Sequence, residues 1–217
     1  TLGGLLAFEY EPGVAPHFAP GAPAPTAVIF CGPGWEQWNP DQIDEQGLGG
    51  SETAVVRLAE QLVKRGIRVM VYAEAEGTWN GVHYRKYTKW NPAAPVWVFI
   101  AWRNATLFDN DIQADLKYLW LHDTDIGATL TETRASKVDS ILCLSQWHRQ
   151  NLRQKYPFVE DDKYTIIGNG IDPTRFDGFD GKETRENRVI YASSPDRGLE
   201  QVLEYWPEIR KRTGAEL

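Results

Sequence analysis

A glycine-rich stretch directly ahead of a helical pattern is the first group of residues that could bind a phosphorylated ligand. Residues 47–52 read GLGGSE, and the apolar residues after them recur at helical spacing as far as Leu62. Glycine lets a ligand approach the backbone closely, and the free N–H groups at a helix start attract anions. We therefore predict that Gly49 and Gly50 bind a phosphate. A tight loop with Ser51 as an ordinary helix cap explains the same residues without a ligand.

A histidine and an aspartate form the second group. His122 and Asp123 directly follow the apolar run 116–121 (LKYLWL), which is typical of a buried strand. A histidine at a strand end can donate a hydrogen bond to a sugar hydroxyl or move a proton. We predict a catalytic role for both residues. A histidine whose hydrogen bonds are satisfied by the loop backbone is the alternative.

Two further groups lie near the carboxyl end of the sequence. Residues 193–198 (SSPDRG) stand between a predicted strand at 188–192 and a predicted helix at 198–211. A guanidinium beside the amides of a helix start suits a diphosphate, so we predict that Arg197 and Gly198 bind one. An arginine that is simply solvated is the alternative. In GNGID (168–172), Asn169 and Gly170 favour a turn or hinge and could also face a cleft.

Two tryptophans, Trp35 and Trp38, fall in a polar loop containing Gly and Pro. They could stack on the ring of an acceptor sugar, or they could simply anchor the loop. The cysteines Cys31 and Cys143 are isolated within apolar runs, and we predict small buried side chains there. Two isolated cysteines give neither a disulfide framework nor the ligand spacing of a zinc site.

Composition limits the classes of partner. The net charge is -7 without a long Lys/Arg cluster, which argues against nucleic acid. The sequence contains no apolar run of about 18 residues and starts with no signal-peptide pattern, so we expect no transmembrane segment and a cytoplasmic protein. Peripheral contact with a membrane stays open.

Short apolar runs alternate with helical patterns along most of the sequence. This alternation predicts an α/β protein with a doubly wound parallel sheet, in which ligands bind beyond the carboxyl ends of the strands. The predicted strands are 27–31, 68–73, 82–87, 96–102, 116–121, 140–144 and 164–167. The predicted helices are 128–136, 146–156 and a first one that opens at Ser51 and ends just before Gly66.

The domain organisation follows from shifts in composition. Residues 1–25, rich in Pro, Gly and Ala, are expected to be a linker or extension, with a short strand at 5–10. Residues 26–176 form the Rossmann-like domain, and the polar stretch 177–187 forms an interdomain linker. Residues 188–217 hold one strand and one helix of a second lobe, with another strand due to begin at 213–217. One strand and one helix cannot bury a core, so we expect this lobe to be truncated.

Taken in order, these groups resemble the retaining GT-B glycosyltransferases of family four. The stretch GGSETAVVRLAEQLVKRGIRVMVYA is similar to the first helix and second strand of their N-terminal lobe, and His122 is similar to their middle histidine. The segments 169–176 and 194–199 resemble the motifs on either side of their interdomain linker. Ser193 and Ser194 replace a Gly-Arg pair of the family, and Arg197 with Gly198 stands in place of Lys-Gly. The family's E-x7-E motif would lie beyond Leu217.

This resemblance implies the function. A nucleotide diphosphate sugar would donate a sugar to a carbohydrate, lipid or protein acceptor, without cofactor or metal and with retained configuration. Gly49, Gly50, Arg197 and Gly198 would hold the diphosphate, the acceptor would lie on residues 26–176, and further domains of a longer chain would complete an otherwise inactive fragment. Two alternatives remain: an NAD(P)-dependent oxidoreductase using residues 47–50 and Glu74, and a non-catalytic Rossmann-like module.

Overall fold

The computed structural model describes residues 24–34, 37–45, 47–178 and 186–217 of the chain. It forms two compact units, Thr1–Gly170 and Ile171–Leu217. The strand expected at 5–10 and the candidate Trp35 lie outside the described residues.

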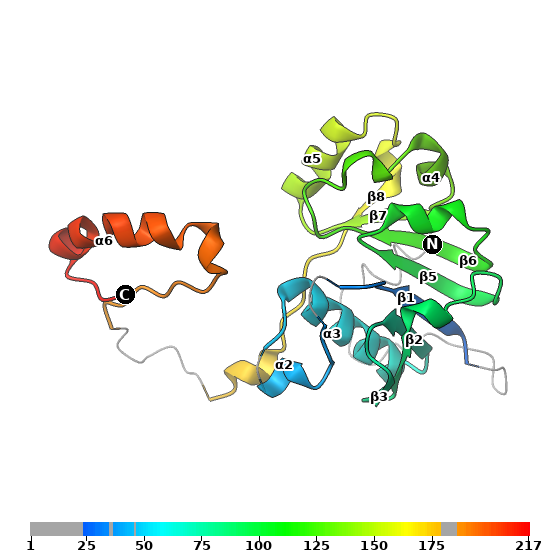
Figure 1. The fold of residues 1–217 in the computed structure, drawn as a ribbon, viewed down its shortest axis with the longest axis horizontal. Coiled ribbons are helices and arrows are strands. Elements are labelled where there is room, and N and C mark those ends of the chain that lie inside the picture. The colour runs from blue at the N-terminus through cyan, green and yellow to red at the C-terminus, as the bar shows by residue number, and fades with distance from the viewer. Residues whose placement is uncertain (1–23, 35–36, 46, 179–185) are drawn as a thin grey trace. The chain divides into compact units, whose positions relative to one another are not determined.

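An eight-stranded sheet forms the centre of the first unit (Figure 1), in the order β3-β4-β2-β1-β5-β6-β7-β8. All neighbouring strands pair in parallel except β3, which runs antiparallel to β4. The strands are β1 (Thr26–Phe30), β2 (Arg68–Ala73), β3 (Gly77–Trp79), β4 (Val82–Lys86), β5 (Val96–Trp102), β6 (Ala114–Trp120), β7 (Ser140–Cys143) and β8 (Tyr164–Ile166). Without β3 this is the Rossmann-like order, which reverses between β1 and β5. The predicted α/β fold is thus confirmed.

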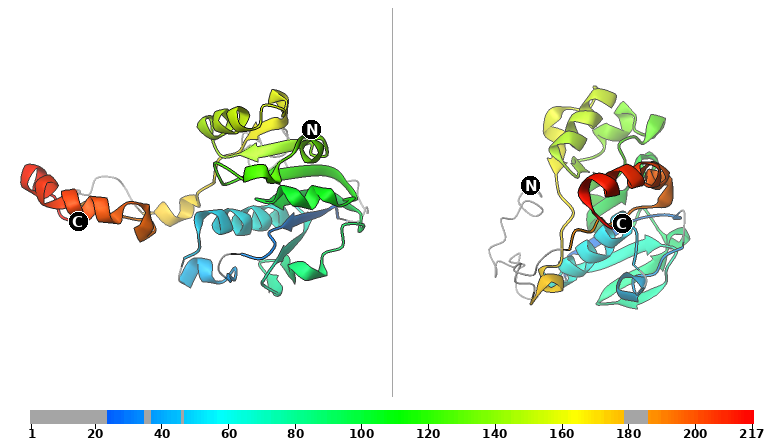
Figure 2. Two further views of the ribbon diagram at one scale, coloured as in Figure 1. Left: turned by 45° about the horizontal axis from the view of Figure 1, so that its top comes forward. Right: turned by 90° about the vertical axis from the view of Figure 1, so that its left-hand side faces the viewer.

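Helices cover both faces of this sheet, so the strands are apolar on both sides. Along β1, Ala27 and Ile29 join one buried cluster while Val28 and Phe30 join the other. The long helix α3 (Gly50–Lys64) covers the first cluster and runs alongside β1 and β2 in Figure 2. The second cluster packs under η2 (Ala105–Asp109), α4 (Glu132–Ser136) and α5 (Gln146–Lys155). The remaining short helices of this unit are α2 (Gln42–Glu45), η1 (Tyr87–Lys89), η3 (Gly127–Thr129) and η4 (Asp161–Lys163).

Local residue choice determines where the helices begin and end. Gly49 is the N-cap of α3, so the expectation that Ser51 caps this helix is wrong. The helix starts one residue earlier than expected, and the Ser51 hydroxyl instead donates to the Glu52 carboxylate over 2.9 Å. At the other end Gly66, with φ +79°, donates its N–H to Val63 and stops the helix.

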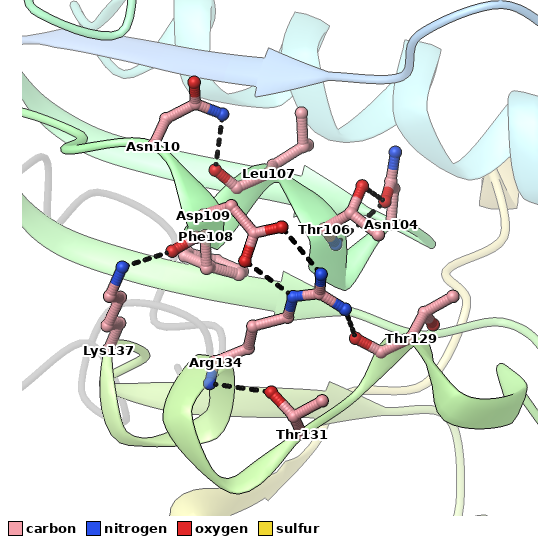
Figure 3. Close-up of polar contacts among 10 residues, drawn as sticks. All are labelled: Asn104, Thr106, Leu107, Phe108, Asp109, Asn110, Thr129, Thr131, Arg134 and Lys137. Carbon is pink, nitrogen blue, oxygen red and sulfur yellow. Dashed lines mark hydrogen bonds and ion pairs between the residues drawn. The ribbon is translucent and has the colours of Figure 1, made fainter.

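The helix expected at 128–136 is shorter in the structure. The 3-10 turn η3 ends at Thr129, and Thr131 caps α4 by accepting a hydrogen bond from the Arg134 N–H. Figure 3 shows how this helix is held: Arg134 donates two bonds to the Asp109 carboxylate, over 2.8 and 2.6 Å. Lys137 donates to the Phe108 carbonyl oxygen over 2.7 Å, so α4 is tied to η2 at two points.

A β-hairpin that the sequence reading overlooked joins β3 to β4. Its two turn residues, Asn80 (φ 48°) and Gly81 (φ 79°), are both left-handed, as a type I′ turn requires. The Asn80 side chain donates to the Glu60 carboxylate on α3 over 2.7 Å. The Trp79 ring meets Tyr84 edge-on at 5.3 Å within the hairpin. Because β4 also pairs with β2, the hairpin is joined to both the rest of the sheet and α3.

The second unit contains η5 (Pro173–Phe176), η6 (Pro195–Arg197) and α6 (Leu199–Thr213). The strand expected at 188–192 is wrong: Arg188 alone of that stretch pairs, in an isolated parallel bridge with Glu216. The Val189 N–H donates to the Glu216 carbonyl oxygen over 2.7 Å, so the second strand expected near 213–217 is reduced to the same bridge. A ladder needs a partner along its length, and residues 190–192 have none among the described segments.

Replacing Gly81 by alanine should destabilise the first unit by about 1–3 kcal/mol, because it forces a left-handed alanine and a clash. A β-carbon there would lie 2.8 Å from the Val63 Cγ1 atom. Gly66 is the matched control: it has the same φ of +79°, but no atom lies within 4 Å of its added β-carbon. Urea unfolding should rank Gly81→Ala below Gly66→Ala in stability, and equal losses would contradict the packing argument.

Candidate functional site

The parallel sheet brings the predicted residues of the first unit to one edge. Strands β1, β5 and β6 are parallel neighbours, so the loops after them leave from the same edge. Helix α3 also begins at this edge, because it crosses back from β1 to the parallel strand β2. Gly49, Gly50, His122 and Asp123 therefore share the carboxyl edge of the sheet, as predicted from their positions after strands.

His122 is partly enclosed by aromatic rings. Its ring centroid lies 4.7 Å from that of Trp120 and 6.1 Å from that of Trp102, the last residues of β6 and β5. Burial, helped by the nearby Arg103 cation and by His148, lowers the pKa of His122 to about 4, while Asp123 opposes the shift. The imidazole is therefore neutral at neutral pH. Its buried Nε2 atom has no hydrogen-bond partner within the described part of the chain.

Asp123 is fully engaged by its neighbours. Arg103 Nε donates to one carboxylate oxygen over 2.6 Å, and Arg103 Nη2 donates to the other over 2.7 Å. The same guanidinium lies 5.0 Å above the ring of Trp102. Because both oxygens accept charged bonds, Asp123 is poorly placed to act as a free base and well placed to fix the turn next to His122.

A second histidine, His148, also holds this turn through hydrogen bonds. It is 4% exposed and lies in the first turn of α5. The Leu144 N–H donates to its Nδ1 over 3.2 Å, so that nitrogen carries no proton. Its Nε2 therefore carries the proton and donates to the Asp123 carbonyl oxygen over 2.8 Å. Both the backbone and the side chain of Asp123 are thus held.

Sequence reasoning missed Arg103 and His148. Each has a weak local signal: Arg103 is the first polar residue after the apolar strand β5, and His148 stands three residues after the helix cap Ser145. Their importance comes from partners 20 and 25 positions away in the sequence, which local sequence patterns do not reveal.

The start of α3 already has a carboxylate beside it. A β-carbon built on Gly49 would lie 2.3 Å from the Glu52 Oε2 atom, so a larger residue at this position would displace the carboxylate. No side chain caps the helix, and Glu52 stands in its first turn, where a negative charge is favoured. A phosphate bound by Gly49 and Gly50 would have to share this position with Glu52. Phosphate binding here stays a prediction.

Arg197 and Gly198 belong to the second unit. Gly198 caps α6 with φ 103° and ψ 14°, a left-handed conformation that favours glycine. Arg197 ends η6 and is exposed, and no hydrogen bond or ion pair to another described residue engages its guanidinium. Ser194 bonds to the Asp196 carboxylate, which lowers the pKa of Asp196 together with the nearby Arg197 charge. The diphosphate role of this loop stays a prediction.

The other predicted site residues are placed as follows. Trp38 is only 6% exposed and meets Tyr84 edge-on at 6.3 Å. This burial corrects the idea that Trp38 stacks on a sugar, because its ring belongs to the core beneath the loop. Asn169 and Gly170 are exposed where the first unit ends, and their hinge or cleft role stays a prediction. Glu74 is half-buried directly after β2.

Two kinds of feature are absent from the described residues. No helix there is both long and apolar enough to cross a membrane. No three His, Cys, Asp or Glu side chains in that part of the chain gather as a ligand set for a metal ion.

Comparison with known proteins gives a likeness at the level of the fold. No protein-family profile matches the chain, and no curated protein matches it either. Among solved structures, the chain is similar to the crystal structure of a glycosyltransferase from Rickettsia africae ESF-5, with a TM-score of 0.51 and 13% sequence identity. The match covers 85% of this chain and 50% of that one, so the chain spans about half the length of that glycosyltransferase. The fold is therefore a glycosyltransferase-like, Rossmann-like α/β fold.

The depressed pKa of His122 predicts a pH-dependent stability. The folded protein keeps this ring neutral down to about pH 4, whereas an unfolded chain protonates it near its ordinary value of 6.5. Between these values the unfolded state binds more protons, so this group lowers the stability as pH falls from about 6.5 to about 4.

We expect His122→Gln to lose less stability than the wild type between pH 7 and pH 5, measured by urea unfolding at both pH values. If the two proteins lose equal stability over this range, the burial argument for His122 fails.

Proposed function

We propose that the natural full-length protein is a retaining glycosyltransferase of the GT-B class. It would transfer a sugar from a nucleotide diphosphate donor to an acceptor. The main support is the carboxyl edge of the sheet, where a neutral histidine, whose Nε2 has no partner among the described residues, stands beside an aspartate held by Arg103. The fold-level likeness to a glycosyltransferase and the ordered motifs point the same way.

In this proposal His122 is the group that meets the reacting sugar. A neutral imidazole can donate or accept a hydrogen bond through Nε2, so it can bind a sugar hydroxyl or move a proton. A positive charge at this position would disfavour the positive charge that develops on a sugar ring during transfer, and burial prevents it. Asp123 would act by holding the turn.

Two groups are candidates for holding the donor diphosphate, Gly49 and Gly50 in the first unit and Arg197 and Gly198 in the second. A diphosphate leaving group gains negative charge as the sugar departs, and a guanidinium stabilises that charge. Arg197 suits this role because its guanidinium is exposed and engages no other described residue. Glu52 works against binding at the α3 start, which makes Arg197 the more important of the two groups.

The acceptor would be a carbohydrate, lipid or protein bound on the first unit, and the reaction would need no cofactor. We place the protein in the cytoplasm, with peripheral membrane contact open and further domains of a longer chain completing the donor site. Trp38 drops out as an acceptor contact because its ring is buried.

The oxidoreductase alternative fits the structure less well. A dinucleotide fold carries its glycine turn directly between the first strand and the first helix. Here residues 31–49, including α2, lie between β1 and α3. Glu74 does follow β2, where such folds bind ribose, so NADH is a necessary control ligand. The other alternative, a non-catalytic Rossmann-like module, is tested by measuring sugar transfer.

The first test is donor binding by the full-length protein, measured by calorimetric titration with a panel of nucleotide diphosphate sugars. Arg197→Ala should weaken binding at least tenfold, about 1.4 kcal/mol, by removing a charged contact to the diphosphate. Arg210→Ala is the control, because Arg210 is an exposed arginine of the same unit, in the last turn of α6. Binding of NADH without binding of any nucleotide sugar would refute the proposal.

The second test concerns turnover. We expect His122→Ala to reduce sugar transfer at least tenfold, equivalent to about 1.4 kcal/mol of barrier. Its unfolding free energy at pH 7 should stay within about 1 kcal/mol of the wild type, since His122 lies at the edge of the core. Wild-type turnover in this variant would remove His122 from the mechanism.

A further inference from the structure

Arg103 stands at the place in the fold where ligands are expected to bind. It directly follows β5, and the strand order reverses between β5 and β1. In open α/β sheets the crevice at this reversal is the usual ligand site. Arg103 also has φ 60°, one of two left-handed non-glycine residues among those described. Such strained residues concentrate at functional sites.

The contacts of Arg103 all lead toward His122. Its N–H donates to the Trp120 carbonyl oxygen over 2.8 Å, and its guanidinium grips Asp123 with two bonds. It also lies over Trp102, whose ring packs against the His122 ring. Asp123 is the next residue after His122. One arginine therefore contacts both aromatic neighbours of His122 and the residue that follows it.

Stability alone does not explain this arrangement. The side chains of Arg103 and Asp123 are 28% and 36% exposed, and ion pairs with this much solvent add little to folding stability. The left-handed backbone costs stability in the other direction. A pair with little net stabilising effect, at a ligand edge and beside a histidine, indicates a role in the site.

We propose that Arg103 is a positioning residue for His122, which holds the Asp123 carboxylate and so fixes the turn that presents the imidazole. The inference rests on the proposed role of His122 in sugar transfer. Arg103 faces His122 from the end of β5, Asp123 faces it from its own turn, and His148 faces it from α5. Of these groups Arg103 is the permanent cation, so it also opposes protonation of the ring.

The first readout needs no activity. In the full-length protein with labelled histidine, the His122 signal is assigned by its loss in His122→Gln. Arg103→Gln should move the NMR titration midpoint of His122 upward, because the opposing cation is gone and Asp123 is left uncompensated. Arg134→Gln is the matched control: Arg134 makes the same two-bond contact with Asp109, away from the site (Figure 3). It should leave the midpoint unchanged.

The second readout is turnover and its pH profile. Arg103→Gln should lower kcat at least tenfold with little change in KM, and should move the acid limb upward like the NMR midpoint. Asp123→Asn should lower kcat similarly. The double variant Arg103→Gln/Asp123→Asn should have a kcat no lower than that of the less active single variant, because both substitutions break the same contact. Arg103→Lys keeps the charge but cannot bind two oxygens in a fork, so it should restore kcat only in part.

An unchanged His122 midpoint in Arg103→Gln, or wild-type kcat in Arg103→Gln or Arg103→Lys, would overturn the inference. Arg103→Lys decides the matter if Arg103→Gln does not fold. A different result would show that the proposed function is wrong. In that case His122→Ala keeps full turnover, while the NMR titration midpoint of His122 still changes in Arg103→Gln.

Discussion

Parallel pairing of β1 with β5 and of β5 with β6 is the constraint on which the candidate site depends. Parallel neighbours end at the same edge, so residues far apart in sequence are forced together there. Arg103 and Asp123 can form two short bonds only because Trp102 and Trp120 are register partners at the ends of adjacent strands. A shift of one residue in this register would turn one of these side chains to the opposite face.

The polar groups at this edge are unevenly matched. The indole nitrogens of Trp102 and Trp120 and the Nε2 of His122 are buried without partners among the described residues. The nearby carboxylate of Asp123 is fully used by Arg103, and its carbonyl oxygen accepts from His148. Buried donors are normally paired, so this edge favours a group that accepts hydrogen bonds, such as a hydroxyl or phosphate oxygen. This preference fits a sugar-bearing diphosphate.

Most of the sheet could be predicted because buried parallel strands are short, continuous apolar runs, and all seven strands expected between residues 27 and 167 exist. The overlooked strand β3 had a local signal in Asn80-Gly81, whereas the stretch after Arg188 looks like a strand and lacks a partner. Burial of Trp38 could not be foreseen from its polar loop, since tertiary contact with Tyr84 decides it. The Arg103–Asp123 contact depends on register, which local patterns do not reveal.

The position of Glu52 changes the balance of the proposed donor site. The start of α3 offers amide hydrogens and a partial positive charge. The Glu52 carboxylate lies against Gly49 and offsets part of that positive charge. A diphosphate placed there would meet a like charge at close range, which costs free energy even near a helix start. Binding by the α3 amides alone is therefore weak, and a tight donor complex requires a compensating cation. Arg103 is already committed to Asp123, so it cannot supply that charge without releasing the carboxylate that it holds beside His122.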